Sequence, residues 1–520
     1  MTTGVWVLGD QLWQGQSALQ SCADRRQQTP VLFIESLDHV QQLPYHLQKI
    51  VLVWSAMRHF AEELRQSGWE VTYKIAEDFR TPLLEWIQAY NITELRVMTP
   101  VDRPFTRMIQ GLNLPCIITF TPSNRFIWQD QEFIDWARSR KRLLMEDFYR
   151  EGRRRFQILM QDDQPLGGRW NFDQENRKPP KGQLLTPKTL WFEPDQTTQA
   201  VINWVKQSPA FKQSQQYWQI EPFPWAVTRT QALQVLNFFV EVRLSGFGPY
   251  QDAMVTGEPT LWHAMLSPYM NIGLLHPLEI VQAAEAAYYR NQDTWALNSV
   301  EGFIRQILGW REYIHGIYLY MGEDYPQRNY FNHTHPLPDF YWTGDTAMNC
   351  LHQVLKQVKE IGYAHHIQRL MILSNFALIA GISPQELEEW FHAAFIDGYD
   401  WVMQPNVIGM GQYADGGAMA SKPYAASANY VNKMSNYCKG CAYNPKKRTG
   451  EGACPFNFMY WDFLARHYDS LKKNPRISQI LHNVDRFSTE EMREIRRLAE
   501  QWRNTHQHTE YSLPSSPATV

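Results

Sequence analysis

"PVLFIES" at residues 30–36 and "EVTYKIA" at 70–76 enclose "SAMRHFAEELRQSG" at 55–68. The two outer runs are short, apolar and rich in residues that favour strands. In the middle run Met57, Phe60, Ala61 and Leu64 recur at helical spacing, and Gly68 offers a stop. A strand, a helix and a second strand in this order predict a parallel βαβ unit.

Three more runs of the same kind extend this pattern, namely "VWVLGDQL" (5–12), "ELRVMTP" (94–100) and "CIITFTP" (116–122). We therefore predict a doubly wound, Rossmann-like parallel sheet in an α/β domain over residues 1–135. The region contains neither G-x-G-x-x-G nor a Walker A motif. A phosphate site of either kind is therefore not expected here.

The rest of the chain differs in composition. Residues 136–200 are predicted to hold a basic helix, "RSRKRLLMEDFYREGRRRF" (138–156), and a connector rich in Gly, Pro and polar residues. Helical periodicity dominates residues 201–505, which predicts a large all-helical domain, and 506–520 is expected to be a flexible tail. A length of 520 residues agrees with more than one domain.

The composition excludes several classes of protein. The N-terminus lacks a basic n-region, and no run approaches the ~18 apolar residues of a membrane span. The net charge of −3 argues against a polycation. We expect a soluble, cytoplasmic monomer without membrane contact or an obligate protein partner. The 20 tryptophans favour stacking on a planar cofactor, on bases or along an electron path.

Cys438, Cys441 and Cys454 lie within seventeen residues and predict a metal site. Zinc would need a fourth ligand, which a histidine could supply. The Cys454-Pro455 pair is typical of iron–sulfur sites, where four thiolates hold a cluster. The remaining cysteines are Cys22, Cys116 and Cys350, and Cys350 is the best fourth ligand because it lies in the helical region. An unmetallated redox pair is the third interpretation.

Several long motifs, in order along the chain, resemble the photolyase/cryptochrome superfamily. "EGFIRQILGWREY" (301–313) is similar to its flavin-domain signature. The stretches "GGRWNFDQENRKP" (167–179), "YQDAM" (250–254), "YAHHIQRLMI" (363–372), "QPNVIGMGQYADGG" (404–417) and "KPYAASANYVNKMSNYC" (422–438) resemble the iron–sulfur bacterial branch, which includes the prokaryotic (6-4) photolyases. The resemblance covers nearly the whole chain.

The resemblance implies FAD in the helical domain, an antenna chromophore, 6,7-dimethyl-8-ribityllumazine, in the α/β domain, and a [4Fe–4S] cluster on Cys350, Cys438, Cys441 and Cys454. It places His366 in the lesion pocket as a proton donor, next to His365, with Tyr424 as the second pocket residue. An imidazole suits this role because both of its forms are accessible near neutral pH. Adjacent helical residues point about 100° apart, so the two histidines cannot share one face.

The same resemblance supplies the other site residues. The implied flavin contacts are Tyr250, His263, Leu266, Ser267, Gln306, Arg311, Tyr363, Arg369, Asp397, Asp400 and Met403, with Arg369 expected to pair with Asp397. The implied antenna contacts are Gly9, Asp10, Gln11, Glu35 and Arg103. Two positions depart from the family pattern. Met403 stands where relatives carry Asn or an acidic residue, and Ala264 replaces a hydroxyl residue in the phosphate-binding stretch.

Trp342 and Trp390 match positions that pass electrons to the flavin in the family, and Arg153, Arg154 and Lys446 are expected to contact DNA phosphates. The function implied is light-driven repair of (6-4) photoproducts in UV-damaged DNA, that is, a FAD-dependent lyase. A cryptochrome-like photoreceptor on the same scaffold is the first alternative. A light-independent iron–sulfur protein that binds nucleic acid is the second.

Overall fold

The computed structural model describes residues 2–181 and 184–506. Its N-terminal part contains one five-stranded sheet in the order β3-β2-β1-β4-β5, and every neighbouring pair is parallel. The strands are β1 (Thr3–Trp6), β2 (Pro30–Ser36), β3 (Glu70–Ala76), β4 (Glu94–Met98) and β5 (Ile117–Thr121). The five strands predicted from the sequence are confirmed, and their order is that of a doubly wound sheet.

Side chains alternate between the two faces of the sheet along β1 and the two residues that follow it, and both faces are covered there. Val5 and Val7 belong to one apolar cluster, whereas Trp6 and Leu8 belong to another. Successive strand residues point to opposite faces, so a continuous apolar run covers both. The helices α3 (Leu47–Gln66), α4 (Arg80–Tyr90) and α5 (Arg103–Gln110) flank the sheet.

The basic segment forms two helices instead of one. Helix α6 spans Asp130–Arg138 and α7 spans Met145–Phe156, and residues 139–144 between them are not helical. The prediction of a continuous helix over 138–156 is therefore wrong at its start. The first turn of α7 carries Glu146 and Asp147, and its last turn carries Arg153, Arg154 and Arg155. Acidic residues near the start of a helix and basic residues near its end interact favourably with the helix dipole, so these charges favour a helix that begins at 145.

Helix α8 (Gln196–Gln207) packs against α3 of the α/β part, although residues from 201 onward were assigned to the helical domain. Trp54 on α3 contacts Trp204 on α8 and Phe211 beyond it, with ring centroids 5.2 and 5.6 Å apart. The chain thus returns to the α/β part before it enters the helical part. The domain boundaries proposed from the sequence stay a prediction.

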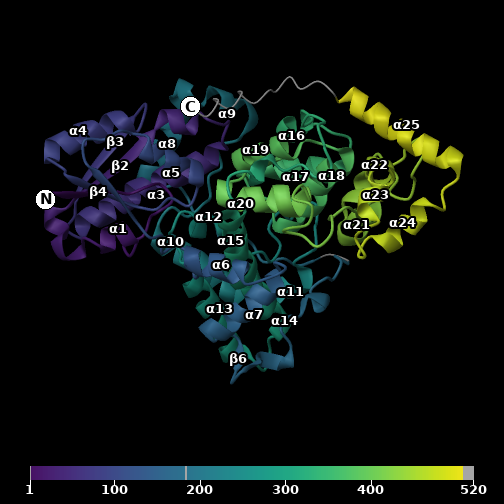
Figure 1. Ribbon diagram of the computed structural model, residues 1–520, viewed down its shortest axis with the longest axis horizontal. Helices are drawn as coiled ribbons and strands as arrows, with labels where there is room; N and C mark the ends of the chain where they lie inside the picture. Colours follow the sequence, from purple (N-terminus) through teal and green to yellow (C-terminus); the bar gives the residue numbers. More distant parts are fainter. Residues whose placement is uncertain (1, 182–183, 507–520) are drawn as a thin grey trace.

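The remainder of the described chain is largely helical (Figure 1). Its elements up to residue 361 are α9 (Lys212–Tyr217), α10 (Arg229–Phe238), α11 (Leu244–Tyr250), α12 (Ser267–Asn271), α13 (Pro277–Asn291), α14 (Leu297–Ile304), α15 (Glu312–Met321), α16 (Phe340–Thr343) and α17 (Asn349–Ile361). After these come α18 (Asn375–Ala380), α19 (Pro384–Ala394), α20 (Asp400–Gln404), α21 (Ala428–Met434), α22 (Pro455–Arg466), α23 (Tyr468–Leu471), α24 (Ser478–Val484) and α25 (Thr489–Thr505).

Figure 1 shows the sheet at one end of the molecule, helices α16 to α20 in the middle, and α21 to α25 at the other end. The chain also forms two short helices, α1 (Ser17–Gln20) and α2 (Leu37–Val40). A two-stranded hairpin consists of β6 (Met160–Gln161) and β7 (Gln164–Pro165). Within residues 2–181 and 184–506, no helix has the length and apolar character that a bilayer crossing requires. Of the tail proposed over 506–520, residues 507–520 lie outside the described part.

His46 joins the α/β part to the helical part. Its Nδ1 accepts a hydrogen bond from the backbone N–H of Gln48 at the start of α3. Its Nε2 lies 3.0 and 3.2 Å from the carbonyl oxygens of Val358 and Lys359, at the end of α17. This geometry requires a neutral ring that carries its proton on Nε2. Burial lowers the pKa of His46 to about 4.

We expect stability to fall as the pH drops from 6.5 to 4, because the unfolded chain takes up the His46 proton first. The contribution of neutral His46 is complete above pH 6.5, and about 3 kcal/mol of it is lost by pH 4. A glutamine does not titrate, so the free energy of unfolding of His46→Gln should depend less on pH than that of the wild type. Parallel pH profiles in chemical denaturation would contradict this assignment.

Candidate functional site

The four cysteines chosen from the sequence line one cavity, together with apolar side chains. Cys350 comes from α17, Cys438 and Cys441 from the loop after α21, and Cys454 immediately precedes α22. Cys350 and Cys454 are buried, and the other two are half-buried. The structure therefore brings together four sulfurs from segments about ninety residues apart.

The spacing of these sulfurs distinguishes between kinds of metal centre. A single zinc bound at Zn–S distances of about 2.3 Å would hold its thiolates roughly 3.8 Å apart. Among the described residues, one group of three potential metal ligands has its ligand atoms within 4.8 Å of one another. That group contains no cysteine. No three of the four sulfurs therefore lie within 4.8 Å of one another, which is a wider arrangement than that of a tetrahedral zinc site. The sulfurs are nevertheless close enough to act on one another, because burial and the neighbouring thiolates raise the pKa of Cys350 well above its usual value.

The adjacent histidines occupy different environments, but the helix begins only at His366, so the expectation that both lie on one helix is wrong for His365. His365 is 1% exposed, and neither of its ring nitrogens has a hydrogen-bond partner. Its ring stacks on His263 at 4.3 Å between centroids, with 10° between the planes. His366 begins the helical turn and is exposed to solvent. Of the two, His366 is the one that an external substrate can reach.

Arg369 and Asp397 form the expected ion pair. Two guanidinium nitrogens donate to the two carboxylate oxygens at 2.9 and 3.1 Å. Ser267 donates to the same carboxylate at 2.6 Å, and Asn271 donates to the backbone carbonyl of Asp397 at 3.0 Å. Arg369 also lies over the ring of Phe395, 3.9 Å from its centroid. Ser267, Arg369 and Asp397, which are far apart in sequence, therefore converge on one point.

π-Helical segments carry several of these residues: η5 (Phe239–Arg243), η6 (Arg305–Arg311), η8 (Gln368–Ser374) and η9 (Pro405–Gly411). Such turns are rare and occur frequently at functional sites. Gln306 and Arg311 lie in η6, and Arg369 lies in η8. Buried Arg311 has two guanidinium nitrogens, Nε and one terminal nitrogen, without hydrogen-bond partners. Buried donors without partners are uncommon and indicate a place where a ligand binds.

The other proposed flavin residues are distributed around this centre. Leu266, Tyr363 and Met403 are buried, and Tyr250 stacks on Trp262, the neighbour of His263, at 4.8 Å. The amide of Gln306 donates back to the carbonyl of Gly302 within its own helix. Asp400 is not part of the Arg369–Asp397 pair. Its Oδ1 lies 3.7 Å from the Nδ1 of His392. The roles of these residues toward a flavin stay predictions.

Tyr424 lies in a segment that is fixed to the helix beginning at His366. Asn375 donates to the carbonyl of Ala426 at 3.0 Å and accepts from its backbone N–H at 2.9 Å. Tyr424 is half-buried, and burial raises the pKa of its phenol. The phenol therefore stays protonated at neutral pH and can donate a hydrogen bond.

The proposed antenna residues lie at the carboxyl ends of the strands, where the sheet meets the helical part. The Glu35 carboxylate is fully buried and accepts hydrogen bonds from Arg58 at 2.8 and 2.9 Å. Asp10 pairs with Arg125 at 2.5 Å, and Gln11 donates to Met98 while its Oε1 has no partner. A Cβ on Gly9 would approach Val53 to 2.8 Å.

Arg103 crosses to the helical part. Its guanidinium lies 3.7 Å from the ring centroid of Tyr318 on α15 and donates to the carbonyl of the same residue. Arg103 also donates to Gln404 at 3.3 Å. The expected antenna residues thus share one edge of the sheet, and Arg103 is already engaged by the helical part.

The two proposed electron-transfer tryptophans are buried. Trp342 contacts Tyr217 and Trp218, with centroids 4.8 and 5.7 Å apart. Trp390 contacts Tyr341, the sequence neighbour of Trp342, at 5.3 Å. Neither tryptophan lies at the surface. An electron path through both would therefore need a further aromatic residue at its outer end.

Arg153 is a correction to the DNA contacts expected from the sequence. Its side chain is fully buried, and its guanidinium donates to the carbonyl oxygens of Ile158, Leu159 and Trp170. It holds the turn after α7 and cannot reach a phosphate. Arg154 is exposed and lies over Trp170 at 4.5 Å, and Lys446 is exposed in the cysteine loop. These two remain available to an external anion.

Sequence reasoning missed the connection between the cysteine loop and the histidine segment. Tyr437 precedes Cys438, and its hydroxyl accepts a hydrogen bond from Gln368 at 3.1 Å. The Oε1 of Gln368 accepts from the backbone N–H of His365, also at 3.1 Å. Both residues lie inside motifs that were quoted for the resemblance. Nothing in their spacing shows that they meet.

Comparison with known proteins identifies the family. The sequence model of the deoxyribodipyrimidine photo-lyase-related protein family matches residues 5–225. A protein of Agrobacterium fabrum named (6-4) photolyase is 44% identical over 507 residues, which cover 96% of this chain and 98% of that protein. This chain belongs to the photolyase/cryptochrome superfamily. The match to the Agrobacterium protein extends over both the α/β part and the helical part of this chain.

Solved structures show the same fold. A bacterial class III photolyase from Agrobacterium tumefaciens aligns with a TM-score of 0.52 and 16% identity, over 95% of this chain and 91% of that one. A cryptochrome from Synechocystis aligns with a TM-score of 0.55 and 12% identity, over 97% and 99%. These likenesses establish a photolyase-like fold, with a parallel α/β domain followed by a largely helical domain.

The ion pair at the centre of this photolyase-family site yields a prediction. In Asp397→Asn, Arg369 loses its counter-charge in a buried position, which we expect to cost about 3 kcal/mol of unfolding free energy. Asp469→Asn is the matched control, because its pair with Lys472 is exposed and a surface pair contributes little to stability. Denaturant titration of both variants measures the difference. Equal losses would contradict a structural role for the buried pair.

Proposed function

We propose that this protein repairs (6-4) photoproducts in DNA under blue light, with FAD as its cofactor. The observation that carries this proposal is the 44% identity, over almost the full length of both chains, to a protein named (6-4) photolyase. The site supports the same function, because an exposed His366 lies next to a cluster of buried polar groups that lack partners.

The residues present fit FAD. Arg311 offers two unpaired guanidinium nitrogens, which suit a phosphate, and His263 and His365 offer unpaired ring nitrogens. Ser267, Arg369 and Asp397 form an anchor close to His365. When it is bound and reduced, FAD supplies the electron that light excites. The protein supplies the binding site, the orientation of the lesion and the proton.

His366 is proposed to hold the proton that the lesion needs. A photoproduct reaches such a site by leaving the base stack of the duplex. The neutral phenol of Tyr424 is suited to donate a hydrogen bond to the lesion from the opposite segment. Exposed Arg154 and Lys446 are proposed to bind the phosphates, so binding should weaken as salt concentration rises.

The cysteine cavity supports a [4Fe–4S] cluster. Four thiolates line it, and their spacing exceeds what one zinc ion would impose. The cluster would tie α17 and α22 to the loop that carries Tyr437. We propose a structural role for it, because three separate segments of chain meet there.

The carboxyl edge of the sheet supports a lumazine antenna. Gln11 and Tyr399 have buried polar atoms without partners at the boundary between the sheet and the helical part. A ribityl chain offers hydroxyl groups that could satisfy both. The absorbance and fluorescence excitation spectra of the purified protein would identify such a chromophore.

The decisive experiment incubates the reduced protein with an oligonucleotide that carries one (6-4) photoproduct, in blue light and in the dark. We expect the intact bases to be restored only in the light. If protein with reduced FAD and an intact iron–sulfur centre restores nothing, the repair function is wrong and the photoreceptor becomes the better hypothesis.

A further inference from the structure

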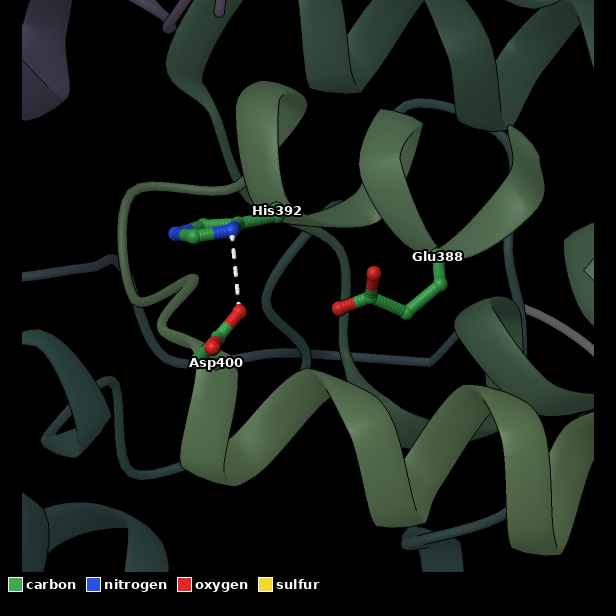
Figure 2. Close-up of side chains that lie close together, drawn as sticks. All are labelled: Glu388, His392 and Asp400. Atoms are coloured by element: carbon green, nitrogen blue, oxygen red, sulfur yellow. Dashed lines mark ion pairs between the residues drawn. The ribbon is translucent and has the colours of Figure 1, made fainter. Parts of the chain in front are cut away.

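A second cluster of potential metal ligands lies outside the cysteine cavity. Glu388 and His392 are four residues apart on α19, and Asp400 begins α20. One ligand atom from each of the three lies within 4.8 Å of the others. Figure 2 shows the Glu388 carboxylate and the Asp400 carboxylate turned toward the space beside the His392 ring. Residues at i and i+4 share a helix face, which places the first two side by side.

Glu388 provides an independent sign that a ligand is bound here. Its side chain is 8% exposed, and its Oε1 has no hydrogen-bond partner. A buried polar atom without a hydrogen-bond partner is costly. The Nδ1 of His392 and the Oδ1 of Asp400 are 3.7 Å apart, which is too long for a hydrogen bond. Two ligands of one ion at about 2.1 Å are typically separated by roughly 3–3.5 Å.

We propose that Glu388, His392 and Asp400 bind one divalent first-row metal ion, such as Mn²⁺ or Zn²⁺. One imidazole and two carboxylates suit these ions, whereas thiolates would favour softer ones. This site is separate from the four cysteines and does not depend on the repair function proposed above.

The electrostatics around the cluster support the proposal. Burial and the charge of Asp400 raise the pKa of Glu388 well above its usual value. Asp102 of the α/β part faces the same carboxylates, and burial and Asp400 raise its pKa as well. Burial and Lys49 lower the pKa of His392. A divalent cation would relieve the repulsion among the carboxylates.

Lys49 is the main competitor for this role. Its ammonium donates to the carbonyl oxygen of His392 at 3.1 Å and lies over the rings of Tyr45 and Tyr399. Arg103 also acts on Asp400 from α5. Among the described ion pairs, neither cation reaches Glu388, which leaves that carboxylate to the metal.

The ion would join α19 to the start of α20. The loop between them, residues 395–399, carries Asp397, which pairs with Arg369. A metal link across the base of this loop would hold Asp397 in place. It would also fix the boundary between the helical part and the α/β part, where Asp102 accepts a hydrogen bond from the backbone of Trp401 at 3.0 Å.

Equilibrium dialysis of the full-length protein with its cofactors, against Mn²⁺ in excess Mg²⁺, tests the site. The expected result is one bound Mn²⁺ per chain, with affinity reduced at least about tenfold in Glu388→Gln and in His392→Gln. Glu389→Gln is the matched control, because Glu389 follows on the same helix and points about 100° away. Its affinity should fall much less than that of Glu388→Gln, because Glu389 acts on the site only through its charge. Equal binding by all four proteins, or no binding at all, would overturn the proposal.

A measurement on the wild type keeps the test valid if a variant fails to fold. Pulsed electron paramagnetic resonance of the bound Mn²⁺ should show coupling to one imidazole nitrogen. Bound Mn²⁺ without such coupling would be adventitious and would exclude His392 as a ligand. An absence of Mn²⁺ and Zn²⁺ binding at micromolar concentrations would mean that Lys49 neutralises the carboxylates instead.

Discussion

Light-driven repair of a (6-4) photoproduct by His366→Ala is expected to fall by about 10²–10⁴-fold, the usual contribution of a positioned acid or base. His366 is exposed at the start of its helix, whereas His365 is buried and stacked on His263. Only His366 can therefore deliver a proton to a substrate from outside. The measurement is the rate of base restoration per absorbed photon, with lesion binding determined separately.

The pH dependence follows from the same residue. The surrounding protein and the positive charge of Arg369 lower the pKa of His366, although water screens part of this effect at an exposed ring. The ring is therefore mainly neutral at pH 7, and a proton donor must be protonated. We expect repair to rise as the pH falls from 8 to 6, and this rise should be absent in His366→Ala.

His482→Ala is the matched control for this experiment, because His482 is exposed on α24, away from the site. It should repair as the wild type does at every pH. If His366→Ala repaired lesions at the wild-type rate, the proton would have to come from another group. Tyr424→Phe would then be the next variant to measure.

Cys350→Ser is expected to abolish the proposed iron–sulfur centre and to prevent stable folding of the helical part. Cys350 is one of the two buried members of the set, and it lines the cavity in which the segments of Cys438 and Cys454 meet α17. Binding energies of structural metal sites reach about 10–16 kcal/mol, which is comparable to the whole stability of a domain. Iron and sulfide analysis and the yield of folded protein measure the effect.

Two comparisons make the cysteine experiment specific. Cys441 is half-buried, so Cys441→Ser should lose less folded protein than Cys350→Ser does. Cys116 lies in the α/β part, outside the cavity, so Cys116→Ser should keep its full content of iron and sulfide. Wild-type protein that contains zinc and no sulfide would show that the metal site is real but that the cluster is wrong.

Features that depend on residues close together in the sequence could be predicted from the sequence alone. The strands at 30–36 and 70–76 were predicted with their observed bounds, because side-chain alternation and turn residues are local signals. Cys438, Cys441 and Cys454 were singled out by their spacing, which is also a local signal, and Cys350 was added because it lies in the helical region. The Arg369–Asp397 pair came from the resemblance, which carries tertiary information that the residues by themselves do not.

Only the tertiary structure decided which charged residues are buried and which side chains meet. Arg153 looks like a surface residue in its basic run, but carbonyl oxygens from a later turn enclose its guanidinium. Glu388 and His392 share a helix face in any helical prediction, but Asp400 joins them only after the chain has turned through residues 395–399. Burial and pairing depend on contacts between distant segments, and these arise from packing, which has no period in the sequence.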